Sequence, residues 1–315
     1  MINKSVIAKD RCITKLLKQL SDFTGADITL KGGSSLIKGY KITGRMSEDV
    51  DLVFNLKNNS NNKKERNKVS KSIIKLIEEV FQVSKGKPKG GGGNHYSAVL
   101  EEKLEGETIK LDLSFSNYKV ENKKMDIYEL NNDMELKRTE IKFQVANLCD
   151  TFYDKIFSFQ NKTYTKLFKP NTTWNFKKTN WKKNKIDDDE KKLTKITSID
   201  LKRLARHAYD ITVIYKKEFI KIDFIEEKKK NELNKHIVAQ DGKKILKSTY
   251  ENDLFDFLIF NKPDKIREWL ISFKKDFIDL DVDKVISGLE EIKDDIKNEY
   301  NKSQHKSTQE KTSSK

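Results

Sequence analysis

Two aspartates separated by a single residue are the feature of this sequence that most directly suggests chemistry. Asp49 and Asp51 lie in a segment that alternates polar and apolar residues up to Phe54. This period-two alternation predicts a half-buried β-strand, in which residues i and i+2 point to the same face with Cα atoms roughly 6–7 Å apart. Such a pair suits Mg²⁺, which binds one or two carboxylates together with substrate phosphates. Taken alone, the pair is also compatible with a solvated strand face.

A glycine-rich turn precedes the aspartates. Gly32, Gly33 and Ser34 follow a short apolar segment and lead into a short helix-like stretch. Successive backbone N–H groups in such a turn bind anions, and a helix N-terminus adds a favourable dipole for phosphate. The turn therefore changes the interpretation of the aspartate pair from a solvated strand face to a site for metal and phosphate.

The spacing of these residues resembles that of a known family. The GG[ST]…R-x-S-x-D-x-D signature of AbiEii-type nucleotidyltransferase toxins is similar to the run formed here by Gly32, Gly33, Ser34, Arg45, Ser47, Asp49 and Asp51. These MenT-like toxins act in type IV toxin–antitoxin systems and belong to the DNA-polymerase-β-like nucleotidyltransferase superfamily. The resemblance implies an α+β fold, with a mixed sheet and helices followed by a mostly helical domain.

Three later segments resemble further parts of the family pattern. Asp112, in a segment that alternates apolar and polar residues, is a candidate for the superfamily's third carboxylate on a later strand. The run that begins Asp154-Lys155 resembles the family's EK-h-x-A helix, with an aspartate in place of its glutamate. Residues 206–211 resemble the R-D-h-Y-D-h helix, with His207 in place of its first aspartate. The four blocks occur in the family's order, and the resemblance fades beyond them.

The resemblance implies roles for these residues. Asp49 and Asp51 would ligate two Mg²⁺ ions, and Asp112 would join them or help to activate the incoming hydroxyl group. Two ions about 3.5–4 Å apart can stabilise both the attacking and the leaving oxygen of an in-line displacement at phosphorus. The backbone N–H groups of Gly33 and Ser34, and the Ser34 hydroxyl, would hold the triphosphate.

Further side chains complete the expected active site. By the resemblance, Lys155 would place a point charge against the phosphates. Arg45 is either an active-site neighbour that contacts the nucleotide or an ion-pair partner of a metal-ligating aspartate. Arg206 and Asp210 are spaced i, i+4 on one helix face, which also fits an ordinary intrahelical ion pair. The family pattern assigns Arg206 to nucleotide binding and makes Asp210 a candidate proton acceptor in catalysis.

The composition favours a polyanionic partner. The 315 residues include 64 Lys and Arg against 49 Asp and Glu, which gives a formal net charge of +15, and 36% of them are hydrophobic. A basic excess of this size concentrates nucleic acid near a protein, although a lysine-rich composition is also typical of AT-rich genomes. The length is sufficient for two domains.

A lysine-rich segment with interleaved aromatic residues is the candidate RNA-binding region. Residues 161–185 contain eight lysines, five aromatic residues and no Asp or Glu. Basic side chains follow phosphates, and aromatic rings stack on unpaired bases at about 1–3 kcal/mol per base. The residues selected for RNA contact are Lys177, Lys178, Trp181, Lys182 and Lys183. The alternative is a surface loop whose aromatic residues anchor it to the helical domain.

Other functional classes find no support in the sequence. Cys12 and Cys149 lack C-x-x-C spacing and are expected to be buried free thiols in a reducing cytoplasm. The four histidines are scattered, so no zinc site is expected. No stretch approaches the roughly 20 apolar residues of a membrane span, and the N-terminal residues lack the apolar run of a signal peptide. We therefore expect a cytoplasmic protein without membrane association.

Apolar spacing and turn residues divide the chain into three regions. By the resemblance, residues 1–145 would form a nucleotidyltransferase domain and residues 146–300 a helical domain that completes the active site and contacts RNA. The polar composition of residues 301–315 predicts a disordered tail. The first region is expected to contain helices over 5–21 and 69–81 and strands over 28–30, 49–54, 96–104, 108–115 and 136–143. The second is expected to contain helices over 146–161, 199–215, 228–236, 250–260, 265–277 and 282–300. Four glycines at 90–93 favour a mobile loop over a phosphate-binding loop.

The sequence as a whole predicts a Mg²⁺-dependent nucleotidyltransferase toxin. By the resemblance, it would transfer nucleotides from an NTP to RNA, with the 3′ end of a tRNA as the expected acceptor. This would block translation in abortive infection against phage, and a separately encoded antitoxin would oppose it. Two alternatives are a nucleotidyltransferase that modifies a protein or a small molecule such as an aminoglycoside, and a non-catalytic basic RNA-binding module. The complete set of Asp49, Asp51 and Asp112 argues against the last.

Overall fold

The computed structural model shows an α+β protein whose chain divides into two compact units. The first unit comprises residues 1–151 together with 276–279, and the second comprises 152–275 together with 280–315. The residues that the structure describes are 4–42, 45, 47, 49–56, 62–84, 95–104, 106–116, 120–163, 198–215, 263–274, 277, 280–295 and 298.

The first unit is built on a mixed sheet, which confirms the predicted fold class. In the described residues this sheet has seven strands, in the order β3-β4-β5-β2-β1-β7-β6. The strands are β1 (Asp27–Lys31), β2 (Asp49–Asn55), β3 (Phe81–Ser84), β4 (His95–Glu102), β5 (Thr108–Phe115), β6 (Asn122–Leu130) and β7 (Leu136–Ala146). β2 is parallel to β5 and β1 is parallel to β7, while the other neighbours are antiparallel.

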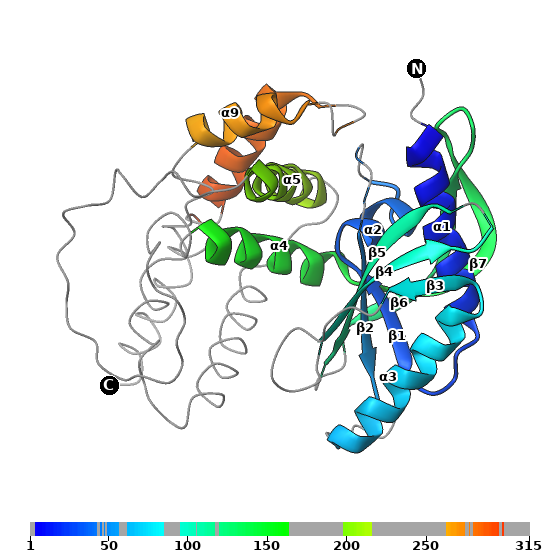
Figure 1. Cartoon of the computed structure of the whole chain (residues 1–315). Helices are drawn as coiled ribbons and strands as arrows, with labels where there is room; N and C mark the ends of the chain where they lie inside the picture. The colour runs from blue at the N-terminus through cyan, green and yellow to red at the C-terminus, as the bar shows by residue number, and fades with distance from the viewer. Residues whose placement is uncertain are drawn as a thin grey trace, which may run out of the picture. The chain divides into compact units, whose positions relative to one another are not determined.

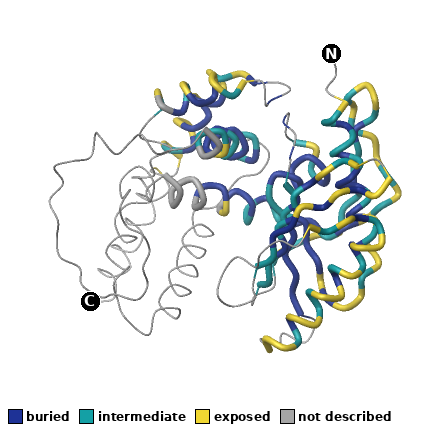
Figure 2. The backbone as a smooth tube through the Cα atoms, viewed as in Figure 1, coloured by how far each residue is buried: buried dark blue, intermediate teal, exposed yellow. Residues whose placement is uncertain are grey.

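Helices of the first unit bury the apolar face of the sheet. α1 (Lys4–Ser21) and α3 (Lys63–Glu78) lie along this face (Figure 1), whereas α2 (Gly32–Lys38) follows β1 directly. The shared core includes Leu16 of α1, Ile77 of α3, and Leu52 and Leu111 of the two central strands. Because strand residues alternate between faces, the polar residues of β2 and β5 point to the other side of the sheet. Figure 2 shows the central strands β1 and β2 largely buried and the outer surface of α3 exposed.

The second unit is helical in its described residues. α4 (Leu148–Thr163) begins in the first unit and continues into the second, which also contains α5 (Ser198–Tyr215), α9 (Pro263–Ser272) and a helix over 282–295. Asn147 caps the start of α4, because its side-chain oxygen accepts a 3.0 Å hydrogen bond from the Cys149 N–H group. Ala208 and Ile211 are fully buried on α5.

Most elements predicted within the described residues are confirmed, with three differences. The helix predicted over 69–81 begins earlier, at Lys63, and ends at Glu78, because Phe81 enters β3. β3 and β6 were not predicted. The helix predicted over 265–277 ends at Ser272. The predicted helices over 228–236 and 250–260, the glycine run at 90–93 and the tail over 301–315 lie outside the described residues.

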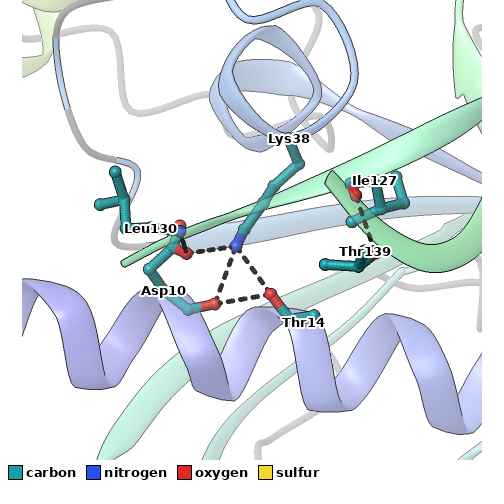
Figure 3. A network of polar contacts seen from close by, with 6 residues as sticks. All are labelled: Asp10, Thr14, Lys38, Ile127, Leu130 and Thr139. Atoms are coloured by element: carbon teal, nitrogen blue, oxygen red, sulfur yellow. Dashed lines mark hydrogen bonds and ion pairs between the residues drawn. The ribbon is translucent and has the colours of Figure 1, made fainter. Parts of the chain in front are cut away.

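A buried ion pair joins α1 to α2. Lys38 Nζ lies 2.6 Å from Asp10 Oδ2, and neither side chain is exposed. The ammonium group also donates to the Asp10 carbonyl oxygen at 2.9 Å and to Thr14 Oγ1 at 2.8 Å, while Asp10 Oδ2 accepts the Leu130 N–H group at 2.8 Å (Figure 3). Burial lowers the pKa of Lys38, and the Asp10 carboxylate opposes that shift. The pair fixes the last turn of α2, whose first residue is Gly32.

Candidate active site

The carboxylates predicted to form the site lie on adjacent central strands. Asp51 of β2 is directly opposite Asp112 of β5, and Asp49 is directly opposite Lys110. Residues opposite each other, and residues two apart along a strand, share a face of the sheet. The register therefore brings three carboxylates and one ammonium group together on the face opposite the apolar core.

Asp112 is held by three polar neighbours. Lys110 Nζ lies 2.9 Å from its Oδ2 atom, and His95 Nε2 lies 3.5 Å from its Oδ1 atom. Ser97, directly opposite on β4, contributes a side-chain hydrogen bond. Burial by itself raises the pKa of Asp112, but the hydrogen bonds from Ser97 and Lys110 and the charges of Lys110 and His95 outweigh it, so the pKa is lowered. Asp112 is therefore ionised at neutral pH, which a metal ligand or a proton acceptor requires.

Asp51 lies against the first glycine of the turn. Gly32 has a φ angle of +70°, a conformation that residues with a Cβ atom rarely adopt. A Cβ atom at this position would lie only 2.1 Å from Asp51 Oδ2. Position 32 therefore requires glycine for two reasons: the backbone conformation and the close approach of the carboxylate.

The second glycine makes room for Arg45. A Cβ atom at Gly33 would lie 2.8 Å from Arg45 Nη2 and 3.1 Å from Ser47 Oγ. Arg45 is only 4% exposed, and its backbone forms an isolated antiparallel bridge with Phe277. The guanidinium group thus lies at the turn that the sequence predicts to bind phosphate.

Two serine hydroxyls meet at the first residue of β2. Ser34 Oγ donates to the Asp49 carbonyl oxygen at 2.6 Å, and Ser47 Oγ donates to the same atom at 2.9 Å. Both serines are buried. These bonds fix the start of β2 relative to the glycine turn. Since the Ser34 hydroxyl is already bonded to the strand, the predicted contact of Ser34 with a triphosphate depends on the backbone N–H group of this residue.

We expect the Gly32→Ala variant to lose activity as well as stability. The positive φ angle costs an alanine about 1–2 kcal/mol, and the added methyl group must displace the Asp51 carboxylate. Gly106→Ala is the matched control, because Gly106 has the same φ of +70° with no atom within 4 Å of the added Cβ. Chemical denaturation should show a loss of stability in both variants, whereas nucleotide transfer should fall only in Gly32→Ala. Full activity of Gly32→Ala would contradict a role for Asp51 in that position.

In the second unit, the structure pairs two other predicted residues. Lys155 Nζ of α4 lies 2.8 Å from Asp210 Oδ2 of α5, with side-chain exposures of 10% and 0%. The sequence placed Asp210 on one helix face with Arg206 and did not predict a partner on another helix. Asp210 is thus a buried carboxylate charge with a lysine counter-ion. The proposed roles of Lys155, Arg206 and Asp210 toward a nucleotide stay predictions.

Three further sequence predictions concern the cysteines, the RNA contacts and membrane-spanning helices. Cys12 and Cys149 are free thiols, the first buried and the second half-buried. The predicted RNA contacts Lys177, Lys178, Trp181, Lys182 and Lys183 lie outside the described residues. Among the helices that the structure describes, none combines the length and the hydropathy needed to cross a bilayer.

Three polar neighbours of Asp112 were not predicted from the sequence: Lys110, His95 and Ser97. A polar residue on a half-buried strand ordinarily marks its solvated face, so none of the three stands out by residue type alone. Lys110 could have been found from its spacing, since it lies two residues before Asp112 and must share its face. His95 and Ser97 become neighbours of Asp112 only through the antiparallel register of β4 and β5, which the sequence does not specify.

One known protein family matches most of this chain. The profile of the family described as nucleotidyl transferase AbiEii toxin, type IV TA system, matches residues 15–285, which include both strands and all of the predicted motifs. The chain belongs to this family. It is accordingly a nucleotidyltransferase, and its family implies an NTP substrate and a separate antitoxin.

Two solved structures are similar to this AbiEii-family protein along most of the chain. The nucleotidyltransferase toxin MenT4 of Mycobacterium tuberculosis is 15% identical over 94% of this chain and 92% of its own, with a TM-score of 0.47. JHP933 of Helicobacter pylori is 16% identical over 98% of this chain and 100% of its own, with a TM-score of 0.46. No curated protein sequence matches the chain significantly.

Proposed function

We propose that this AbiEii-family protein transfers a nucleotide from an NTP to the 3′ end of a tRNA in a Mg²⁺-dependent reaction. A tRNA with a blocked 3′ end cannot be aminoacylated, so translation would stop, which would act as a defence against phage. The reaction would take place in the cytoplasm, where the antitoxin would oppose the enzyme. The observation that carries this proposal is the register that sets Asp51 opposite Asp112, with Asp49 on the same face. The formal net charge of +15 supports a polyanionic acceptor.

The donor set of the sheet is compatible with Mg²⁺. Asp49, Asp51 and Asp112 offer carboxylate oxygens, the ligands that this ion prefers, and Gly32 leaves space for the Asp51 carboxylate at the turn. Within the described residues, no three His, Cys, Asp or Glu side chains converge on one point as metal ligands. The three carboxylates share one face of the sheet, and their side chains would have to turn toward a common ion in order to hold it. When bound, Mg²⁺ would neutralise charge on the α-phosphate and favour ionisation of the attacking hydroxyl.

The protein's own groups would bind and orient the reactants. The N–H groups of Gly33 and Ser34, with the Arg45 guanidinium beside them, would hold the triphosphate through charge-assisted hydrogen bonds. Asp112, kept ionised by its neighbours, would accept the proton of the attacking 3′ hydroxyl. That oxygen then bonds to the α-phosphorus, and the bond from this phosphorus to the bridging oxygen breaks to release pyrophosphate. Lys155 and Asp210 are proposed to contribute a phosphate-facing charge and a carboxylate, as in the family pattern.

A comparison of acceptors tests the proposal. The full chain is incubated with Mg²⁺ and each α-labelled NTP, together with intact tRNA, tRNA whose 3′-terminal diol has been oxidised by periodate, an aminoglycoside, or a mixture of proteins. We expect label in intact tRNA alone, and no label with the Asp49→Ala variant. Equal labelling of oxidised tRNA would exclude the 3′ end as the acceptor. Label on protein or aminoglycoside, with none on tRNA, would replace the proposed substrate by the corresponding alternative.

A further inference from the structure

The ammonium group of Lys110 lies between two of the three site carboxylates. Its Nζ atom is 2.9 Å from Asp112 Oδ2 and 3.7 Å from Asp49 Oδ2. Both contacts follow from the backbone, because Lys110 is directly opposite Asp49 across the parallel strands and two residues from Asp112 along β5. This position is therefore a property of the register and not of one side-chain conformation alone.

A cation at this position offsets a repulsion that the same register creates. Asp51 and Asp112 are like charges placed directly opposite each other, an arrangement that destabilises paired strands. Asp112 and Lys110 are both partly buried, with side-chain exposures of 21% and 33%, so solvent screens their charges incompletely. The positive charge of Lys110 thus reduces the mutual repulsion of the three clustered carboxylates.

We infer that Lys110 and a divalent cation compete for the space between Asp49 and Asp112, so that metal enters this part of the site only in exchange for the ammonium group. The inference rests on the proposed function. A Mg²⁺ ion binds carboxylate oxygens at about 2.0–2.1 Å, and an ion shared by Asp49 and Asp112 would occupy the region where Nζ now lies. Two cations in contact repel strongly, so the ammonium must leave.

The lysine side chain is suited to such an exchange. Its four-carbon stem is flexible and ends in a compact charge that water hydrates well. Since the side chain is one-third exposed, it can withdraw into solvent without a change in β5.

Metal binding by the full chain tests the inference without reference to activity. Mn²⁺ affinity is measured by titration calorimetry for the wild type, Lys110→Met, Lys110→Gln, Lys110→Arg and Lys124→Met. We expect both neutral Lys110 variants to bind Mn²⁺ about tenfold more tightly, as removal of a charge within a few ångströms of the ion predicts. Lys110→Arg should remain close to the wild type. Lys124→Met removes the same charge from an exposed position on β6 and should also leave the affinity unchanged.

Each outcome separates the inference from the proposed function. Mn²⁺ affinity that is equal or lower in both neutral variants would show that the ammonium and the metal coexist, which overturns the inference alone. Absence of Mn²⁺ binding by every protein at millimolar concentration would overturn the metal-dependent mechanism as well. The thermal midpoint provides a second measurement, because Mn²⁺ should raise it further in Lys110→Gln than in the wild type.

Discussion

The Asp51→Asn variant is expected to lose nucleotide transfer while remaining folded. Asp51 lies between the Gly32 turn and Asp112 of the neighbouring strand, so an amide there removes a ligand and a charge from the centre of the site. We expect kcat to fall by at least about 100-fold, because changes to residues that merely support metal ligands already cost about 10–100-fold. Single-turnover incorporation of an α-labelled NTP measures the effect.

A carboxylate elsewhere on the sheet provides the control for that variant. Asp126 of β6 pairs with the exposed Arg138 at 2.9 Å, so Asp126→Asn removes the same charge from a surface ion pair. This control should keep wild-type activity. If Asp51→Asn keeps more than about one tenth of the wild-type rate, which is less than the loss expected even for a supporting residue, Asp51 is not a ligand of the reacting centre.

The Asp10→Asn variant is expected to have the largest effect on stability. It removes the only carboxylate that the described part of the structure shows in direct contact with the Lys38 ammonium group, at a pair where neither side chain is exposed. Breaking a buried pair in this way typically costs about 3–5 kcal/mol in the free energy of unfolding. Because Lys38 closes the helix that begins at Gly32, the glycine turn should also lose its fixed position. Chemical denaturation of the full chain gives the stability difference.

Removing both charges separates the ion pair from the packing around it. The double variant Asp10→Leu/Lys38→Met should recover most of the lost stability, since apolar groups of similar size often replace buried pairs at little cost. Asp126→Asn, at an exposed pair, should cost no more than about 1 kcal/mol. A stability loss in Asp10→Asn as small as that of Asp126→Asn would contradict the structural role assigned to the buried pair.

The central strands could be predicted from the sequence because each has one face toward solvent and one face toward the apolar core. Alternating apolar residues around Asp49, Asp51 and Asp112 specify β2 and β5, and their common face follows from the period of two. β6 was missed because it lies at the edge of the sheet and its residues are mostly charged or polar. β3 was missed because Phe81 continues the apolar spacing of the helix before it.

The order of the strands, and with it most of the site, could not be predicted. Parallel pairing of β2 with β5 joins residues about sixty positions apart, and no local pattern encodes which residue of one strand meets which of the other. The buried Lys38 shows the same limit, because a lysine in a short helix ordinarily faces solvent. Only the approach of α1, which brings Asp10 beside it, explains why that side chain is buried.

The position of the label on the NTP tests the central claim most directly. The full chain is incubated with Mg²⁺ and tRNA, and with the NTP labelled either at the α-phosphate or at the γ-phosphate. Nucleotidyl transfer predicts that the α-label appears on the tRNA and that the γ-label appears only in pyrophosphate. With the Asp51→Asn variant, neither labelled product should form. Transfer of the γ-label to the acceptor would identify a phosphoryl transferase. Release of inorganic phosphate without labelled RNA would identify a hydrolase, and either result would contradict the chemistry assigned to Asp49, Asp51 and Asp112.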